Sequence, residues 1–539
     1  MIPIFDILYK NSSDREVLSS HDRLLDDLLL KDVVEFFARD FELSRKILSL
    51  LSSPLKNAEN ITVRQEVSGD FIGNTGLYED FVRLGEECDE VDKSLKIIEK
   101  SSSSAFGITK GKSAFTDYRS IILKMRSLGN DVAKVFNLYK TAVHILERRS
   151  LHSDVLIGLR NFSKNITMKD EFQQLIDLAD EIADSMTTDT SFRLFVILDK
   201  FLRIENSIVF EITTDPYGYK QAFAEQEKKK GISINFSEQL SAFLGIDQQD
   251  AYFKKLRKQE TPNKDDVFYM DSSEELEEQL SMLVDNAITR ICNLLEDIVI
   301  QFKRPFDRIR DDLYFFRFAL TLKRRFTEMN IPFCMPLIEH EHDVFEMTEG
   351  YDIWLATMYE SKFGDMSNVL VPNDISMQND ENILIVTGQN SGGKTVFIRT
   401  IGIIQAFGRI GLPVPARSAR INAGKNLFTF FTSMDKGQSR FEEETLRISE
   451  ILDNAKKGDM VLLNEVFQST SFDEGAEILT DILFVLNKFG IKTVTVTHLP
   501  KIRELLVKLE NEQNTKIKSI FATAQSTENK NKYKILIEK

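Results

Sequence analysis

The sequence predicts an α + α/β protein in which a region of long helices precedes a nucleotide-binding domain with a parallel-rich sheet. Three observations support this. The pattern of residues 1–340 is almost continuously helical, a phosphate-binding motif lies late in the chain, and short apolar segments alternate with helices around that motif. We therefore place a helical domain at residues 1–340 and a second domain at 341–539.

The composition excludes several classes of protein. The chain has 539 residues and 42% hydrophobic content, but no apolar run reaches the roughly 18 residues that a membrane span needs. The first residues carry Asp6 and lack the basic region and the small-residue cleavage site of a signal peptide. Cys88, Cys292 and Cys334 are scattered and form neither a disulfide framework nor a metal-binding spacing. We therefore expect a cytoplasmic protein with no membrane partner.

The net charge of −15 is unevenly distributed. Residues 376–539 carry 22 Lys and Arg against 19 Asp and Glu, which is a net +3, so that residues 1–375 carry −18. A strongly acidic surface repels the phosphate backbone of nucleic acids. Any nucleic acid must therefore be bound through local basic patches.

Helical periodicity dominates the first domain. In residues 118–149, for example, apolar residues recur at spacings of three and four with charged residues between them. From Ser272 to Asn330 the pattern is long enough to suggest a lever or stalk, with Pro305 as a predicted kink or break.

The regular pattern falters between about residues 205 and 275, which we interpret as a clamp-like insertion at the tip of the stalk. Two basic clusters fall in this segment. They consist of Lys228, Lys229 and Lys230, and of Lys254, Lys255, Arg257 and Lys258. A solvated helix face and a contact with a phosphate backbone are both compatible with such clusters.

The motif with the most specific chemistry is TGQNSGGKTVF at residues 387–397. Its glycines allow backbone N–H groups to converge on phosphates, and the helix that follows directs its positive end toward them. Lys394 supplies a charge and Thr395 a hydroxyl for Mg²⁺. The predicted cofactor-binding residues are Gly388, Gln389, Asn390, Ser391, Gly392, Gly393, Lys394, Thr395 and Val396. The predicted cofactors are ATP and Mg²⁺.

Two later segments are predicted strands that end in polar side chains. DMVLLNE (459–465) ends in Asn464 and Glu465, and KTVTVTH (492–498) ends in His498. Ligands of open α/β sheets bind at the carboxyl ends of the strands, so we expect Glu465 to orient water and His498 to bond the γ-phosphate or that water. A solvated carboxylate and a structural imidazole are the simpler alternatives.

Position 464 would ordinarily be an aspartate that supports Mg²⁺. Asparagine has the same shape and can accept a hydrogen bond, but it lacks the charge. We therefore expect weak Mg²⁺ binding or slow turnover.

Residues 437–455 predict a further helix that begins after Ser439. The hydroxyl of Ser439 and the free N–H groups of the helix start could face an anion, or Ser439 could be a simple N-cap. The predicted buried face consists of Leu446, Ile448, Ile451, Leu452 and Ala455.

Together these motifs resemble the MutS family of ABC-type ATPases over about residues 370–535. GQNSGGKT resembles the family's P-loop GPNxxGKS, and GQSRFEEE its signature loop S-T-F-x-x-E. LLNEVFQSTSFDEG resembles LLDEIGRGTSxxDG, and TVTVTH resembles TLFATH. Near residue 50, SPLKNAENITVRQEVSGDF resembles the start of the family's helical core.

The resemblance implies roles for individual residues. Ser439 would be the signature serine, Glu465 the catalytic base, and His498 the switch histidine. Lys394 would act with them in catalysis, and the segment 469–471 would be the D-loop. The family also implies a homodimer of head-to-tail ATPase domains, in which Ser439 completes the partner's site, and long helices that pass the nucleotide state to a clamp on DNA.

Departures from the family pattern argue against recognition of mispairs. The helical core begins almost at Met1, so we expect no mispair-reading domain before it. The chain stops at YKILIEK, about where the family adds a helical dimerisation element. We therefore expect a MutS-like DNA-repair ATPase that clamps structured or branched DNA.

Two alternatives remain open. Asn464 favours an ATP-gated binding switch with negligible hydrolysis, and a ribosome- or RNA-associated ATPase would use the same nucleotide site. We do not expect a subunit of an ABC transporter, because the sequence has no LSGGQ signature and its helical N-terminal region lacks the form of a coupling surface.

Overall fold

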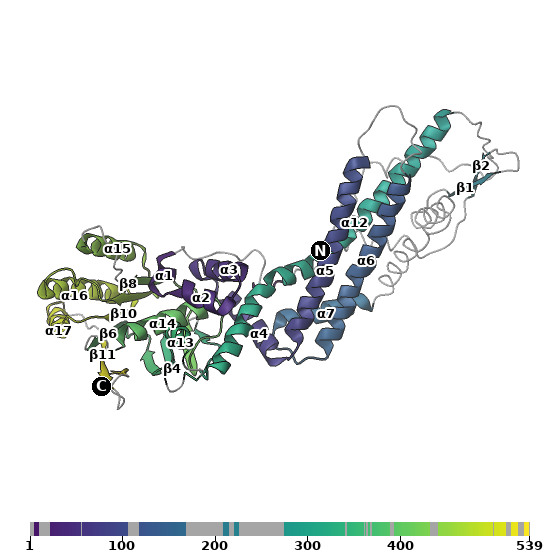
Figure 1. The fold of residues 1–539 in the computed structure, drawn as a ribbon. Helices are drawn as coiled ribbons and strands as arrows, with labels where there is room; N and C mark the ends of the chain where they lie inside the picture. The colour runs from purple at the N-terminus through teal and green to yellow at the C-terminus, as the bar shows by residue number, and fades with distance from the viewer. Residues whose placement is uncertain are drawn as a thin grey trace. The chain divides into compact units, whose positions relative to one another are not determined.

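A computed structural model describes most of the chain. The described residues are 5–9, 22–54, 56–105, 118–168, 209–214, 220–225, 274–339, 342–360, 362, 365–366, 369–388, 393–431, 440–499, 501–513, 519–526 and 533–537. Two compact units result (Figure 1). One comprises Met1–Phe5, Glu79–Leu151 and Leu156–Asp311, and the other comprises Asp6–Tyr78, His152–Val155 and Asp312–Lys539.

The first unit is built mainly from long helices. They are α5 (Leu77–Ala105), α6 (Tyr118–Glu147), α7 (Asp154–Thr167) and α12 (Glu274–Glu328). β1 (Val209–Thr214) and β2 (Lys220–Glu225) form an antiparallel pair. In Figure 1, α5, α6 and α12 run side by side. The hydroxyl of Tyr139 on α6 donates to the carbonyl of Phe302 on α12 at 2.7 Å, so that a buried polar group is satisfied within the helical core.

Helix α12 is 55 residues long and continues through Pro305. The predicted long helix is therefore present. Of the kink or break predicted at the proline, the break is wrong. Charged side chains bind this helix to α5. Lys303 lies 2.7 Å from Asp92, and Arg310 lies 2.7 Å from Asp89. Residues of α12 up to Asp311 belong to the first unit and the remainder to the second.

The second unit contains a six-stranded sheet in the order β12-β11-β6-β10-β9-β8. Its strands are β6 (Ile383–Gly388), β8 (Leu427–Phe431), β9 (Met460–Asn464), β10 (Lys492–Val496), β11 (Ser519–Ser526) and β12 (Tyr533–Ile537). Neighbouring strands from β11 to β8 pair in parallel, and β12 pairs antiparallel with β11. The predicted strands and their parallel α/β arrangement are confirmed.

In the described part of this unit, four helices belong to this sheet. They are α14 (Lys394–Gly408), α15 (Arg440–Asn454), α16 (Phe472–Lys488) and α17 (Ile502–Gln513). α14 is buried along almost its whole length, as are β6, β9 and β10. Continuous apolar runs of this kind are typical of parallel strands that are covered on both faces.

A second, four-stranded sheet and a group of short helices complete the second unit. The sheet has the order β3-β7-β4-β5, with β3 (Leu337–Glu339), β4 (Phe345–Gly350), β5 (Asn373–Met377) and β7 (Ser418–Asn422). The helices are α1 (Asp22–Asp27), α2 (Leu30–Ala38), α3 (Phe41–Ser52), α4 (Ala58–Gly73) and α13 (Ile353–Tyr359). Within the described part of the chain, none of the helices combines the length and the apolar character that a membrane crossing requires.

Arg64 on α4 joins three segments of the second unit. Its Nε donates to the carbonyl of Leu8 at 3.0 Å, and its Nη1 donates to the carbonyl of Ile410, just beyond α14, at 3.1 Å. The guanidinium also lies 5.4 Å from the ring centre of Phe315 on α12. Burial lowers the pKa of Arg64, and Tyr9 is among the groups that oppose this shift. One side chain thus links α4 and α12 to the end of α14.

We expect Arg64→Leu to lower the free energy of unfolding of the second unit by about 2–4 kcal/mol, because two buried carbonyls lose their donor. Calorimetric unfolding of the full chain measures this change. Arg45→Leu is the matched control, since Arg45 pairs with Glu42 on the surface of α3, where both side chains are more than 60% exposed. Equal shifts for the two variants would contradict the role assigned to Arg64.

Candidate functional site

The candidate site lies at the carboxyl ends of three adjacent strands. Val496 of β10 is level with Val386 of β6 and with Asn464 of β9. The pairing continues past the strands, because the N–H of Thr497 donates to Val386 at 3.1 Å and the N–H of Glu465 donates to Val496 at 2.9 Å. Residues that follow these strands are therefore brought to one edge of the sheet.

Lys394 opens α14 directly behind β6. Gly393 precedes it as the N-cap with φ 76°, a left-handed conformation that glycine adopts without steric cost. The Lys394 ammonium donates to the carbonyl of Gly388 at 2.9 Å, and only 3% of the residue is exposed. Burial lowers the pKa of Lys394, and the carboxylate of Glu465 opposes this shift. A desolvated cation at a helix N-terminus is suited to bind phosphate.

Thr395 and Asn464 supply neighbouring oxygens. The Thr395 hydroxyl donates to Oδ1 of Asn464 at 3.3 Å, and Asn464 is 6% exposed. Hydroxyl and amide oxygens are hard ligands that fit Mg²⁺, which is commonly completed by water and substrate phosphates. Neither oxygen carries a charge. The described residues contain no group of three or more His, Cys, Asp and Glu side chains that could hold a metal ion.

Glu465, His498 and Lys394 form a chain of polar contacts. Glu465 has φ 57°, which is unusual for a residue with a side chain. Its Oε1 lies 2.6 Å from Nε2 of His498, and Nδ1 of His498 lies 3.4 Å from the Lys394 ammonium. An ammonium can only donate, so Nδ1 accepts and Nε2 carries the proton that it donates to Glu465. A neutral imidazole thus bridges a cation and a carboxylate.

Helix α15 begins at Arg440, as predicted, but part of its predicted buried face is wrong. Leu446 is 60% exposed and Leu452 is 36% exposed, whereas Glu444 and Arg447 are buried at 2% and 8%. The charged residues replace the leucines because each has a partner inside the fold. The predicted burial is confirmed for Ile448 and Ile451 and is partial for Ala455.

Arg447 binds an aspartate from the N-terminal part of the chain. It donates to Oδ2 of Asp27 at 2.8 Å, and the same oxygen accepts from the hydroxyl of Thr429 at 2.8 Å. Burial raises the pKa of Asp27, and Arg447 opposes this shift. The sequence gives no local signal for this contact, whereas Glu444 could have been noticed as the last residue of GQSRFEEE.

Several predicted site residues lie outside the described part of the chain. They are Gln389, Asn390, Ser391 and Gly392 of the P-loop, Ser439, and the basic residues Lys228, Lys229, Lys230, Lys254, Lys255, Arg257 and Lys258. Val396 is described and lies in the first turn of α14, where its carbonyl accepts from Thr400 at 2.8 Å.

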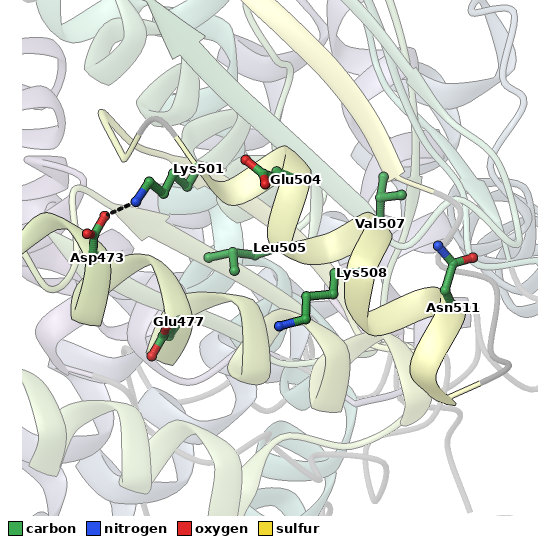
Figure 2. Close-up of a pocket in the computed structure, with 8 residues that line it drawn as sticks. All are labelled: Asp473, Glu477, Lys501, Glu504, Leu505, Val507, Lys508 and Asn511. Carbon is green, nitrogen blue, oxygen red and sulfur yellow. Dashed lines mark ion pairs between the residues drawn. The ribbon is translucent and has the colours of Figure 1, made fainter.

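A groove between α16 and α17 is separate from this edge (Figure 2). It is lined by Asp473, Glu477, Lys501, Glu504, Leu505, Val507, Lys508 and Asn511. Lys501 pairs with Asp473 at 2.8 Å across one end. None of the predicted nucleotide-site residues lines the groove, so the candidate site is the sheet edge that holds Lys394.

Comparison with known proteins points to one family. Residues 384–538 match the family model of MutS domain V. The chain is 33% identical over 173 residues to the DNA mismatch repair protein MutS of Aquifex pyrophilus. This match covers 31% of this chain and 20% of that protein. It is 27% identical over 311 residues to the protein of the same name from Thermodesulfovibrio yellowstonii. This match covers 53% of this chain and 35% of that protein.

A second group of relatives matches the same region. The chain is 30% identical over 161 residues to the Endonuclease MutS2 of Streptococcus mutans, which covers 29% of this chain and 21% of that protein. In these three relatives the matched stretch therefore spans between 20% and 35% of the protein.

The geometry predicts the tautomer of His498. In ¹⁵N NMR spectra of the protein without nucleotide at mildly alkaline pH, we expect a neutral ring protonated at Nε2, because Nδ1 accepts a hydrogen bond from the Lys394 ammonium. The signal is assigned by its loss in His498→Gln. Lys394→Met should shift the Nδ1 resonance, whereas Lys425→Met, which changes a lysine outside this contact, should not. A ring protonated at Nδ1 would contradict the arrangement.

Proposed function

Because the chain belongs to the MutS family, we propose that it is a dimeric ATPase that acts as an ATP-gated clamp on DNA. The observation that carries the proposal is the convergence of five side chains at one sheet edge. They are Lys394, Thr395, Asn464, Glu465 and His498. A cation, oxygen ligands for a metal and a carboxylate that can orient water recur in sites of phosphoryl transfer to water. His498 adds an imidazole that contacts this carboxylate.

We assign phosphate binding to Lys394 and the N-terminus of α14. The ammonium donates to the carbonyl of Gly388 at 2.9 Å and lies 3.4 Å from Nδ1 of His498. Phosphate oxygens offer it a charged partner, so ATP binding would draw Lys394 away from the imidazole. Thr395 and Asn464 would hold Mg²⁺, which when bound neutralises charge on the phosphates.

We assign the orientation of the attacking water to Glu465. Its carboxylate accepts from His498, which fixes its position at the end of β9. Once Lys394 binds phosphate, Nδ1 of His498 loses its contact with the ammonium. The ring can then shift, and because Nε2 contacts Glu465, the shift would move the carboxylate. His498 is thus a positioning residue for the catalytic carboxylate and a sensor of the nucleotide.

The helical residues 1–340 would form the core and lever, and residues 341–539 the ATPase domain. α12 contributes to both compact units, which supports the lever. We further propose that the segment at about 205–275 is the clamp and that it contacts structured or branched DNA rather than mispairs. The relatives named for DNA mismatch repair support DNA as the partner. In the homodimer, Ser439 of each chain would complete the partner's site.

A second candidate function is an ATP-gated switch with negligible hydrolysis. Asn464 favours this function, because the side-chain oxygens of Thr395 and Asn464, which would bind Mg²⁺, carry no charge. In this version ATP closes the dimer, and release of ATP opens it again.

ATP hydrolysis by the purified chain tests the proposal. We expect turnover that rises with a DNA junction more than with duplex or single-stranded DNA at matched salt, and that falls about 100-fold or more in Glu465→Gln while ATP binding persists. Glu477→Gln, which alters a carboxylate of the separate groove, is the control. Tight ATP binding without turnover that depends on Glu465 would favour the switch. Stimulation by ribosomes and by none of the DNAs would contradict the DNA partner.

A Mg²⁺ titration of the hydrolysis rate tests the role of Asn464. We expect Asn464→Asp to lower the Mg²⁺ concentration for half-maximal rate about tenfold, because a carboxylate adds a charge beside Thr395. Asn464→Ala, which removes the oxygen, should raise that concentration. If the wild type and Asn464→Asp have the same midpoint, the lost charge has no consequence for Mg²⁺.

A further inference from the structure

The amino ends of three adjacent strands form the edge of the six-stranded sheet that lies opposite the nucleotide site. Met460 at the start of β9 is level with Lys492 of β10 and with Leu427 of β8. Because the three strands are parallel, the turns that precede them meet at this edge. The basic and aromatic side chains of these turns are referred to as the amino-edge patch. It consists of Lys425, Lys456, Lys457, Lys488 and Phe489.

The turns of the patch lie against one another. The N–H of Gly458 donates to the carbonyl of Gly490 at 3.0 Å, which joins the turn before β9 to the turn before β10. A Cβ at Gly490 would lie 3.3 Å from Cγ of Lys457, and a Cβ at Gly458 would lie 3.1 Å from Cε of Lys425. Phe489 directly precedes Gly490, so the patch is continuous across the three turns.

The end of α16 holds Phe489 in an exposed position. The N–H of Ile491 donates to the carbonyl of Leu486 at 3.0 Å, and the N–H of Gly490 donates to the carbonyl of Asn487 at 3.0 Å. These are the two bonds of a Schellman helix end. The turn buries Ile491, which is 2% exposed, and leaves Phe489 64% exposed. A fixed backbone thus presents an aromatic ring to solvent.

The four lysines of the patch have no ion pair within the part of the chain that the structure describes. Three of them are exposed, and Lys425 is half-buried. Other surface lysines of this unit differ in this respect, since Lys501 and Lys534 pair with aspartates at 2.8 Å and 3.2 Å. The patch therefore offers cations that lack a protein counter-charge.

Two carboxylates that lie against these turns are bound to the fold. Asp459 is 2% exposed and accepts from the N–H groups of Lys456 and Asn426, both at 2.8 Å. Asp343 accepts from the amide of Asn422. Because these carboxylates are engaged by protein donors, the lysines remain free to bind an external anion.

We propose that the amino-edge patch binds single-stranded nucleic acid, with the lysines on phosphates and Phe489 stacked on a base. Sites for single strands combine cations that follow the backbone with aromatic rings on which bases stack. In a duplex the bases are stacked on one another, so Phe489 has no base to receive. An acidic protein segment would use the lysines but not the ring. The patch is separate from the nucleotide site and from the clamp proposed at residues 205–275.

Fluorescence anisotropy with the purified full-length protein tests the ring. The probes are labelled oligothymidylate and oligouridylate of about 20 nucleotides and a DNA duplex of the same length. We expect Phe489→Ala to lower the affinity for single strands about tenfold and to leave the affinity for the duplex unchanged. Phe489→Trp keeps an aromatic face and should retain binding. Phe41→Ala, which changes a residue of α3 that is 80% exposed, is the matched control.

The salt dependence of the same binding tests the lysines. We expect the double variant Lys457→Gln, Lys488→Gln to bind single strands more weakly and to flatten the slope of log affinity against log salt by about 1.4, which is roughly 0.7 for each lost phosphate contact. The double variant Lys501→Gln, Lys534→Gln removes the same charge from paired lysines and should keep the wild-type slope.

Single-strand affinity that is unchanged in Phe489→Ala, or equal loss in the two lysine double variants, would overturn the proposal. Displacement of the oligonucleotide by polyglutamate, with no effect of Phe489→Ala, would instead identify an acidic protein as the partner. ATP hydrolysis without nucleic acid should stay at the wild-type rate in all these variants, because the patch lies at the opposite edge from Glu465. Failure of the proposed ATPase function would therefore leave this test intact.

Discussion

The parallel pairing of β6, β10 and β9 is the constraint on which the site depends. Because Val496 is level with both Val386 and Asn464, the residues that leave these strands meet at one edge. A slip of one residue in a parallel pair would move a strand end by about 3.3 Å and turn its side chains to the other face. The contact of 2.6 Å between His498 and Glu465 would then be lost. Burial of the apolar runs on both faces holds this register.

In the proposed function, the buried cation Lys394 makes this edge sensitive to nucleotide. Lys394 is buried, and its ammonium donates to the carbonyl of Gly388 and to the ring of His498, which are uncharged partners, whereas phosphate oxygens carry negative charge. The same helix that presents Lys394 ends beside Ile410, whose carbonyl binds Arg64 of α4. Lys394 thus contacts other segments at the start of α14, and Arg64 binds the chain just beyond the end of α14. The end of α14 opposite Lys394 is thus connected to α4 by a hydrogen bond, and to α12 by the contact of Arg64 with the ring of Phe315.

Local patterns were enough to predict the parts of the fold that repeat along the chain. The strands around the P-loop follow from short apolar runs, and α12 follows from a long helical period, although its continuation through Pro305 does not. Local patterns failed on α15, because apolar spacing alone assigned Leu446 to the interior. The residues that face inward there include Arg447, whose partner Asp27 is 420 positions away. Contacts of that separation depend on the packing of whole elements, which a single sequence does not encode in its local period.

The proposed function assigns catalysis to the carboxylate that follows β9 and phosphate binding to the lysine that begins α14. Single-turnover hydrolysis of ATP that is already bound to the protein separates these two roles most directly. The account predicts that wild-type protein converts bound ATP to ADP, whereas Glu465→Gln holds the same amount of ATP uncleaved over that time. Equal rates of ADP formation in the two proteins would show that the chemistry does not depend on this sheet edge and would contradict the account.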